Sequence, residues 1–202
     1  MSTRLCSVVL VLGTVLVVGC ESGPSSPSRP TPLATTPDAA DTASSGRSMQ
    51  PVASSATHTV TMFDACDPET FNAAVGEGTC VRSGGVQFSR FLEELGRHGF
   101  VGAWRFAPSN VRMQVGQVLE AVNRGGEVHT FTEVEEFGGG IVPDLNQLSG
   151  QTTVAPECMQ LQPDDFIAPG GSSSEEEDEA EVEKYQCCIH PWMRAEVRIT
   201  ER

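Results

Sequence analysis

The sequence predicts an all-β fold, a β-sandwich or barrel with one short inserted helix. Three observations support this prediction. Short segments of alternating apolar and polar residues follow one another from residue 58 to the C-terminus, with turn signals between them. The chain has 20 Gly and 13 Pro in 202 residues, and these residues interrupt long helices. Apolar residues make up 39% of the chain, so the core is modest and does not use its whole length.

The first twenty residues are typical of an export signal. Arg4 precedes an uncharged apolar run over residues 6–18, which is too short to span a bilayer comfortably as a helix. The run ends in Gly19-Cys20, and a small residue before a cysteine at this place resembles the lipobox of bacterial lipoproteins. That resemblance implies a signal peptide over 1–19 and lipidation of Cys20, which would anchor an exported, periplasmic or cell-surface protein to a membrane. An ordinary secretory signal with an incidental cysteine is the alternative.

Residues 20–57 form a predicted disordered tether. Ser, Pro, Thr and Ala dominate this segment, and the first aromatic residue of the whole chain is Phe63. Such a stretch cannot bury enough apolar area to offset the entropy lost on ordering. The folded domain is therefore expected over 58–202, joined to the membrane anchor by a flexible spacer.

The elements of the folded domain follow from periodicity. A strand is expected over 58–63, a loop over 66–80, and a helix over 88–97, where apolar residues recur three or four positions apart. The region 135–174 is expected to be mostly loop because it is rich in Gly and Pro. Six further strands are predicted, at 104–106, 111–115, 118–123, 128–134, 181–188 and 193–199.

Four side chains offer the ligands of a metal site. Cys187, His190 and Met193 supply a thiolate, an imidazole and a thioether within seven residues, and His129 supplies a second imidazole from a strand far upstream. Two histidines, one cysteine and a weak axial methionine are the ligand set of a blue-copper electron-transfer site. The soft sulfur ligands suit Cu(I), and imidazole suits both oxidation states. One tight turn between the last two strands would carry three of the four ligands.

Two alternatives remain for these residues. A structural or zinc site would use the same cysteine and histidines, although zinc favours four good N or S ligands and this set has three plus a poor thioether. Met193 is alternatively only the first core residue of the last strand, where apolar and charged residues alternate.

Three stretches resemble the cupredoxin family, and most of all its amicyanin and plastocyanin branch. Residues 106–116 match the family's Phe-x-Pro, alternating strand and glycine, and residues 122–129 match the strand that delivers the first histidine. Residues 187–193 match the short amicyanin-type ligand loop. The resemblance covers roughly 58–63 and 100–202, and it implies an eight-stranded Greek-key β-sandwich. It also implies one type 1 copper, with these ligands: His129, Cys187, His190 and Met193.

The sequence departs from the family pattern at several places. Thr130 follows the first histidine where the family often has Asn, which leaves open whether its hydroxyl replaces a contact that fixes the cysteine loop. Ala121 replaces an aromatic residue on the preceding strand. The stretch 66–99 and much of 135–165 are insertions relative to the family.

Four cysteines remain once those of the leader and the ligand set are set aside: Cys66, Cys80, Cys158 and Cys188. An even number in an exported chain predicts disulfides. Cys66 and Cys80 would close a loop of 15 residues. Cys188 adjoins Cys187 on a strand and so points to the opposite face, which leaves it free to pair with Cys158.

The charge balance limits the partners of this protein. With 27 acidic and 13 basic residues the net charge is −14, which argues against broad binding to nucleic acid. The segment 175–183 holds seven acidic residues in nine positions. It is either a docking patch for a basic redox protein, such as a cytochrome c or an oxidase, or a solvated and flexible hairpin.

Together these observations predict a membrane-tethered, monomeric electron carrier rather than an enzyme. A protein that stores or delivers copper without electron transfer is the alternative function. His190 is expected to be the exposed edge through which electrons leave, and Trp192 beside it is either a docking surface or a lid over the ligand loop.

Overall fold

The computed structural model describes residues 56–202. The predicted signal peptide over 1–19, the lipidation site Cys20 and nearly all of the predicted tether lie outside the described residues. The first strand begins at Thr57, one residue before the predicted start of the domain. Within residues 56–202, no helix combines the length and the apolar character needed to cross a membrane.

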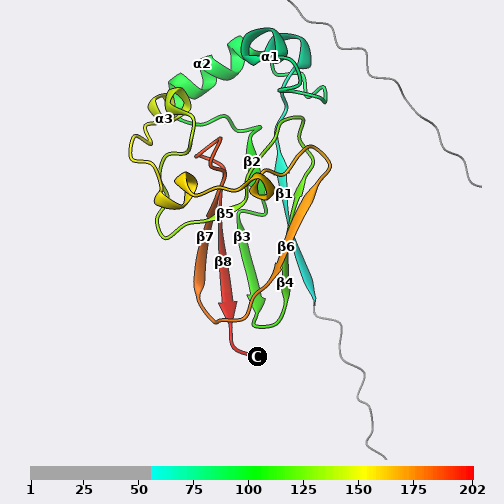
Figure 1. Ribbon diagram of the computed structural model, residues 1–202, viewed down its shortest axis with the longest axis vertical. Coiled ribbons are helices and arrows are strands. Elements are labelled where there is room, and N and C mark those ends of the chain that lie inside the picture. The colour runs from blue at the N-terminus through cyan, green and yellow to red at the C-terminus, as the bar shows by residue number, and fades with distance from the viewer. Residues whose placement is uncertain (1–55) are drawn as a thin grey trace, which may run out of the picture. The chain divides into compact units, whose positions relative to one another are not determined.

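In the described part of the chain, eight strands form two four-stranded sheets that pack as a β-sandwich (Figure 1). The first sheet has the order β2-β1-β4-β6, formed by Arg105–Ala107, Thr57–Phe63, Val118–Asn123 and Ser172–Glu176. The second has the order β3-β8-β7-β5, formed by Asn110–Gln114, Arg194–Thr200, Val182–Gln186 and Thr132–Glu133. Consecutive strands such as β2 and β3, or β4 and β5, lie in different sheets, so the connections cross between the layers. The predicted Greek-key β-sandwich is confirmed.

Alternating side chains of the two sheets make the core. In β8, Ala195, Val197 and Ile199 are buried while Glu196 and Arg198 are exposed. This alternation fixes the register of β8 against both neighbours, because a slip of one residue would move the whole apolar set into solvent. The strand that leads out of the ligand turn is therefore held from both sides: it pairs in parallel with β3 and antiparallel with β7.

The three α-helices within residues 56–202 gather at one end of the sandwich, opposite the C-terminus (Figure 1). They are α1 (Pro68–Val75), α2 (Phe88–His98) and α3 (Pro143–Ser149), and two short 3₁₀ turns follow at Pro156–Met159 and Pro163–Asp165. The turn between β7 and β8, which carries the predicted ligands, lies at this same end (Figure 1). The insertions therefore cover the site that the sequence predicts.

Only α2 matches the single helix predicted from the sequence. The stretches that hold α1 and α3 were expected to be loops, and that expectation is wrong. Helix α1 begins because the side chain of Asp67 accepts a hydrogen bond from the backbone N–H of Thr70 (3.0 Å) and because Pro68 occupies the first turn. Both helices are at most eight residues long, which is too short for the apolar period to show in the sequence.

Two strand predictions also need correction. The segment 128–134 is not a continuous strand: only Thr132–Glu133 pairs with β7, and His129 instead forms an isolated bridge with Ile167. Strand β6 was not predicted, since it lies where a loop and a hairpin were expected. It consists of exposed Ser and Glu residues and is held to β4 by its backbone, so it has no hydrophobic alternation to recognise.

Both predicted disulfides are present. Cys66 is bonded to Cys80 beside α1, and Cys158 is bonded to Cys188 directly after the predicted ligand Cys187. Cys187 is left as the free, buried cysteine of the described region.

The acidic segment over 175–183, predicted as either a docking patch or a solvated hairpin, is mostly exposed, but two of its carboxylates are not. Glu177 follows β6 and Glu183 lies on β7, and both side chains are buried. Burial, together with the charges of Glu183 and Glu175, raises the pKa of Glu177 to about 8. The folded protein therefore holds a proton here that the unfolded chain releases near its ordinary pKa of 4.5.

This raised pKa predicts that the folded protein loses stability as the pH rises. The stabilisation is complete below about pH 4.5 and is lost as the pH passes through about 8, because over that range the folded state binds more protons than the unfolded state. Urea unfolding of the full, metal-free chain at pH 5 and pH 8 measures the difference. Glu177→Gln should flatten the slope, whereas Glu176→Gln, which changes an exposed neighbour, should not. Equal slopes in the two variants would contradict the assignment.

Candidate metal centre

Three of the four predicted ligands meet in the core. The Sγ atom of Cys187 lies 3.8 Å from Nδ1 of His129 and 3.8 Å from Nδ1 of His190. The three donor atoms lie within 4.8 Å of one another, and all three residues are buried. Residues 58 positions apart in sequence thus present one sulfur and two nitrogens to a common point.

The turn between β7 and β8 holds Cys187 and His190 in place. The backbone N–H of Cys187 donates to the carbonyl of Met193 (3.0 Å), and the N–H of Met193 donates to the carbonyl of His190 (2.9 Å). The backbone N–H of His190 also donates a hydrogen bond to the sulfur of Cys187 (3.4 Å). Met193 is fully buried and belongs to the main core. It lies directly before β8 and fits the role of a core residue, and its role as axial ligand stays a prediction.

The Thr130 side chain makes a contact that fixes the cysteine loop, a role that the sequence alone left open. Its hydroxyl oxygen accepts a hydrogen bond from the backbone N–H of Cys188 (2.8 Å), and its own N–H donates to the sulfur of Cys187 (3.5 Å). The residue after His129 therefore ties the segment of the first histidine to the cysteine turn, although it is not Asn.

Two carboxylates lie next to the outer ring nitrogens of the histidines, and the sequence did not predict a role for either of them. Oδ2 of Asp64 lies 2.9 Å from Nε2 of His129, and Oε2 of Glu127 lies 3.7 Å from Nε2 of His190. Glu127 also accepts a hydrogen bond from the indole N–H of Trp104 (2.6 Å). In each imidazole, Nδ1 faces the cysteine and Nε2 faces a carboxylate. Glu127 precedes His129 by two residues, but Asp64 is 65 positions away and carries no local signal.

These contacts set the charge of the site. Burial alone would raise the pKa of Asp64, but hydrogen bonds from His129 and from the backbone of Glu127 and Gly126 outweigh it and lower the pKa to about 2. Burial would likewise lower the pKa of His129, but its contacts with Asp64 and Cys187 raise it to about 9. Burial opposes ionisation of Cys187, yet both histidines lower its pKa well below the ordinary value. The metal-free site therefore favours a thiolate beside an imidazolium.

The spacing of the donors suits a trigonal metal site. Bonds of about 2.0–2.1 Å to imidazole and about 2.3 Å to thiolate, arranged in one plane, place sulfur and nitrogen about 3.8 Å apart. The two distances from the sulfur of Cys187 are both 3.8 Å. Because the donors are one thiolate and two imidazoles, the set fits copper with a weak fourth ligand better than it fits the four strong ligands of structural zinc.

His190 is not the exposed edge that the sequence predicted. Only 3% of its surface is accessible. The ring of Trp192 packs edge-on against it at 5.5 Å, and Phe91 of α2 packs against Trp192 at 6.0 Å. Trp192 is half-buried, as a lid over the ligand turn would be. The prediction failed because α2 belongs to an insertion whose position over the site cannot be read from local pattern.

An apolar cavity of about 630 Å³ adjoins the histidine. Side chains of all three helices line it, including Phe71, Phe91 and Leu145, and the ligand turn contributes Ile189 and His190. The helices thus surround the imidazole with a largely apolar pocket that opens partly to solvent.

Comparison with known proteins gives only distant structural likenesses. No known protein family and no curated protein matches the sequence. A purple cupredoxin from Nitrosopumilus maritimus is similar in structure, with 22% identity and a TM-score of 0.36 over 50% of this chain and 86% of that chain. Amicyanin from Paracoccus versutus shows 18% identity and a TM-score of 0.32 over 50% and 76% of the two chains. A Cu(I) form of an amicyanin variant shows 16% identity and a TM-score of 0.32, over 48% and 73%.

Proposed function

We propose that this protein is an exported blue-copper electron carrier of the cupredoxin type. One copper would be held by His129, Cys187, His190 and, as the weak axial ligand, Met193. The observation that carries the proposal is the buried triangle of Cys187 Sγ and the two Nδ1 atoms, with both sulfur–nitrogen distances at 3.8 Å. Copper in such a site supplies one-electron chemistry by alternating between Cu(II) and Cu(I).

The protein's own residues prepare the site for that chemistry. The ligand turn is fixed by backbone hydrogen bonds within 187–193 and by Thr130, so the donors are in place before a metal arrives. Burial of all three donor residues excludes bulk water from the centre. A preformed and dry site means that few groups have to move when an electron is gained or lost.

The remaining parts of the proposal concern location and partners. Lipidation of Cys20 would hold the domain at a membrane, and the tether over 20–57 would let it reach other proteins. The partner would be a basic redox protein, such as a cytochrome c or an oxidase, drawn to the acidic segment 175–183. We propose a monomeric carrier rather than an enzyme. Half-buried Trp192, in contact with His190, would link the site to the surface.

The test is a visible and EPR titration of the full chain with Cu(II). One equivalent of copper should give an intense thiolate-to-copper band that disappears on reduction. Cys187→Ser should abolish the band because it removes the soft, covalently bonded ligand. Met193→Leu, which keeps a similar volume, should keep the band but alter its energy and the EPR parameters if the thioether is the axial ligand.

Two other outcomes would favour a different function. A colourless complex, or copper that a mild chelator removes at once, would indicate a protein that stores or delivers copper. A site that takes up Zn(II) in preference to copper and shows no change with Met193→Leu would indicate a structural zinc site.

A further inference from the structure

The side chain of Asp64 is buried next to the first histidine. Its side chain is 1% exposed, and its Oδ2 atom lies 2.9 Å from Nε2 of His129. The other ring nitrogen of His129, Nδ1, faces the sulfur of Cys187 at 3.8 Å. One imidazole therefore connects a buried carboxylate directly to the centre of the proposed site.

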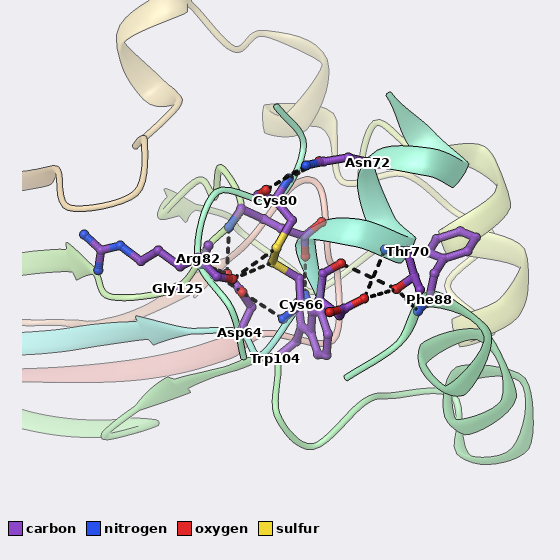
Figure 2. Close-up of a disulfide and its surroundings, with 12 residues drawn as sticks. Asp64, Cys66, Thr70, Asn72, Cys80, Arg82, Phe88, Trp104 and Gly125 are labelled. Carbon is purple, nitrogen blue, oxygen red and sulfur yellow. Dashed lines mark hydrogen bonds between the residues drawn. A yellow bond between two sulfur atoms is a disulfide. The ribbon is translucent and has the colours of Figure 1, made fainter. Parts of the chain in front are cut away.

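Backbone hydrogen bonds also hold the carboxylate in this orientation. It accepts hydrogen bonds from the backbone N–H groups of Gly126 (2.8 Å) and Glu127 (3.0 Å), and Oδ1 also accepts from the N–H of Cys66 (3.3 Å). A Cβ atom at Gly125 would overlap the Asp64 carboxylate, so the close approach of this turn to Asp64 requires glycine at position 125. Figure 2 shows Asp64 beside the Cys66–Cys80 disulfide. This disulfide fixes the backbone two residues after Asp64.

We infer that Asp64 is a positioning residue that orients His129 for the metal and adjusts the reduction potential of the site. This inference rests on the proposed function. The carboxylate accepts the Nε2–H bond of the imidazole, which leaves the lone pair of Nδ1 directed at the metal position. Its negative charge also makes the imidazole a stronger donor and favours the more positively charged state of the metal, Cu(II).

A purely architectural role for Asp64 predicts something different. The hydrogen bonds to Gly126 and Glu127 alone would hold the turn between β4 and His129. In that case a substitution at Asp64 would lower stability but leave metal affinity and potential unchanged. The two roles are therefore separable by measurements on the metal.

The experiment compares Asp64→Asn with Asp67→Asn in the full chain. Both remove one acidic charge within three residues of each other, but Asp67 is the N-cap of α1, a position where Asn serves as well as Asp. Asp64→Asn should weaken Zn(II) binding about 10- to 100-fold, the usual effect of losing such a partner. It should raise the Cu(II)/Cu(I) potential by about 60–120 mV if the whole loss falls on Cu(II), at 59 mV per tenfold. Asp67→Asn should change neither quantity.

Equal Zn(II) affinity and equal potential in the two variants would overturn the inference, whatever their stability. If Asp64→Asn does not fold, NMR of the Zn(II)-loaded wild-type chain decides instead. His129 should then show an Nε2 proton that exchanges slowly and is shifted far downfield by its hydrogen bond to Asp64. A rapidly exchanging, unshifted Nε2 proton, or the reverse tautomer, would overturn the inference. Because Zn(II) binding does not depend on electron transfer, a loss of affinity in Asp64→Asn would stand even if copper gave no blue site.

Discussion

Removing the Cys158–Cys188 disulfide is expected to lower the free energy of unfolding by about 4 kcal/mol. The bond closes a loop of about 31 residues, and freeing that loop returns a corresponding amount of conformational entropy to the unfolded chain. Urea unfolding of the full-length double variant Cys158→Ala and Cys188→Ala, compared with wild type, measures the loss. The matched pair Cys66→Ala and Cys80→Ala opens a shorter loop and should cost about 3 kcal/mol.

The Cys158–Cys188 disulfide should also have the larger effect on the metal site, because it adjoins the ligand Cys187 directly, whereas the Cys66–Cys80 disulfide adjoins Asp64. Cys188 lies directly beside Cys187. Its backbone N–H donates a hydrogen bond to the Thr130 hydroxyl (2.8 Å), and its carbonyl accepts one from the N–H of Ile141 (2.7 Å). Without its covalent link, this segment is held by those hydrogen bonds alone, so we expect weaker metal binding in that variant. A variant that lost stability but kept wild-type Zn(II) affinity would show that the hydrogen bonds suffice to hold Cys187.

The sandwich itself was predictable because its strands alternate. The last strand is the clearest example, since Ala195, Val197 and Ile199 enter the core and charged residues separate them. Strand β6 shows the limit of this reasoning. Its Ser and Glu side chains are all exposed, and only pairing with β4 makes it a strand, so its identity depends on a partner about 50 positions earlier in the chain.

The metal site likewise has one part that local sequence spacing predicts and another that depends on contacts between distant residues. Cys187 and His190 are three residues apart, so their spacing within a turn between two strands was visible in the sequence. Asp64 and Glu127 contact the histidines across long sequence separations, and no local pattern predicts those contacts. Periodicity predicted helix α2, but not its placement over the site. The expected exposure of His190 failed for this reason: the residues that bury it belong to insertions whose placement only the folded chain reveals.

Trp104 joins the inserted helices to the metal site. It is 1% exposed, stacks with Phe71 of α1 at 5.7 Å and packs against Phe91 of α2 at 4.8 Å. Its indole N–H donates to Glu127, the carboxylate that lies 3.7 Å from His190. One side chain therefore supports both the packing of the helices and the position of a buried charge.

Replacing Trp104 by Ala is expected to lower the free energy of unfolding by about 3–5 kcal/mol, because a large cavity opens between the helices and the sandwich. Trp104→Phe keeps an aromatic ring but leaves the Glu127 carboxylate without its donor, which costs about 1–3 kcal/mol. Phe100→Ala, at a site that is 52% exposed, should have little effect and serves as the control. Urea unfolding of the full chain measures all three. If Trp104→Phe were as stable as wild type, solvent or another group would have to satisfy Glu127, and the hydrogen bond from the indole could not be what holds that carboxylate beside His190.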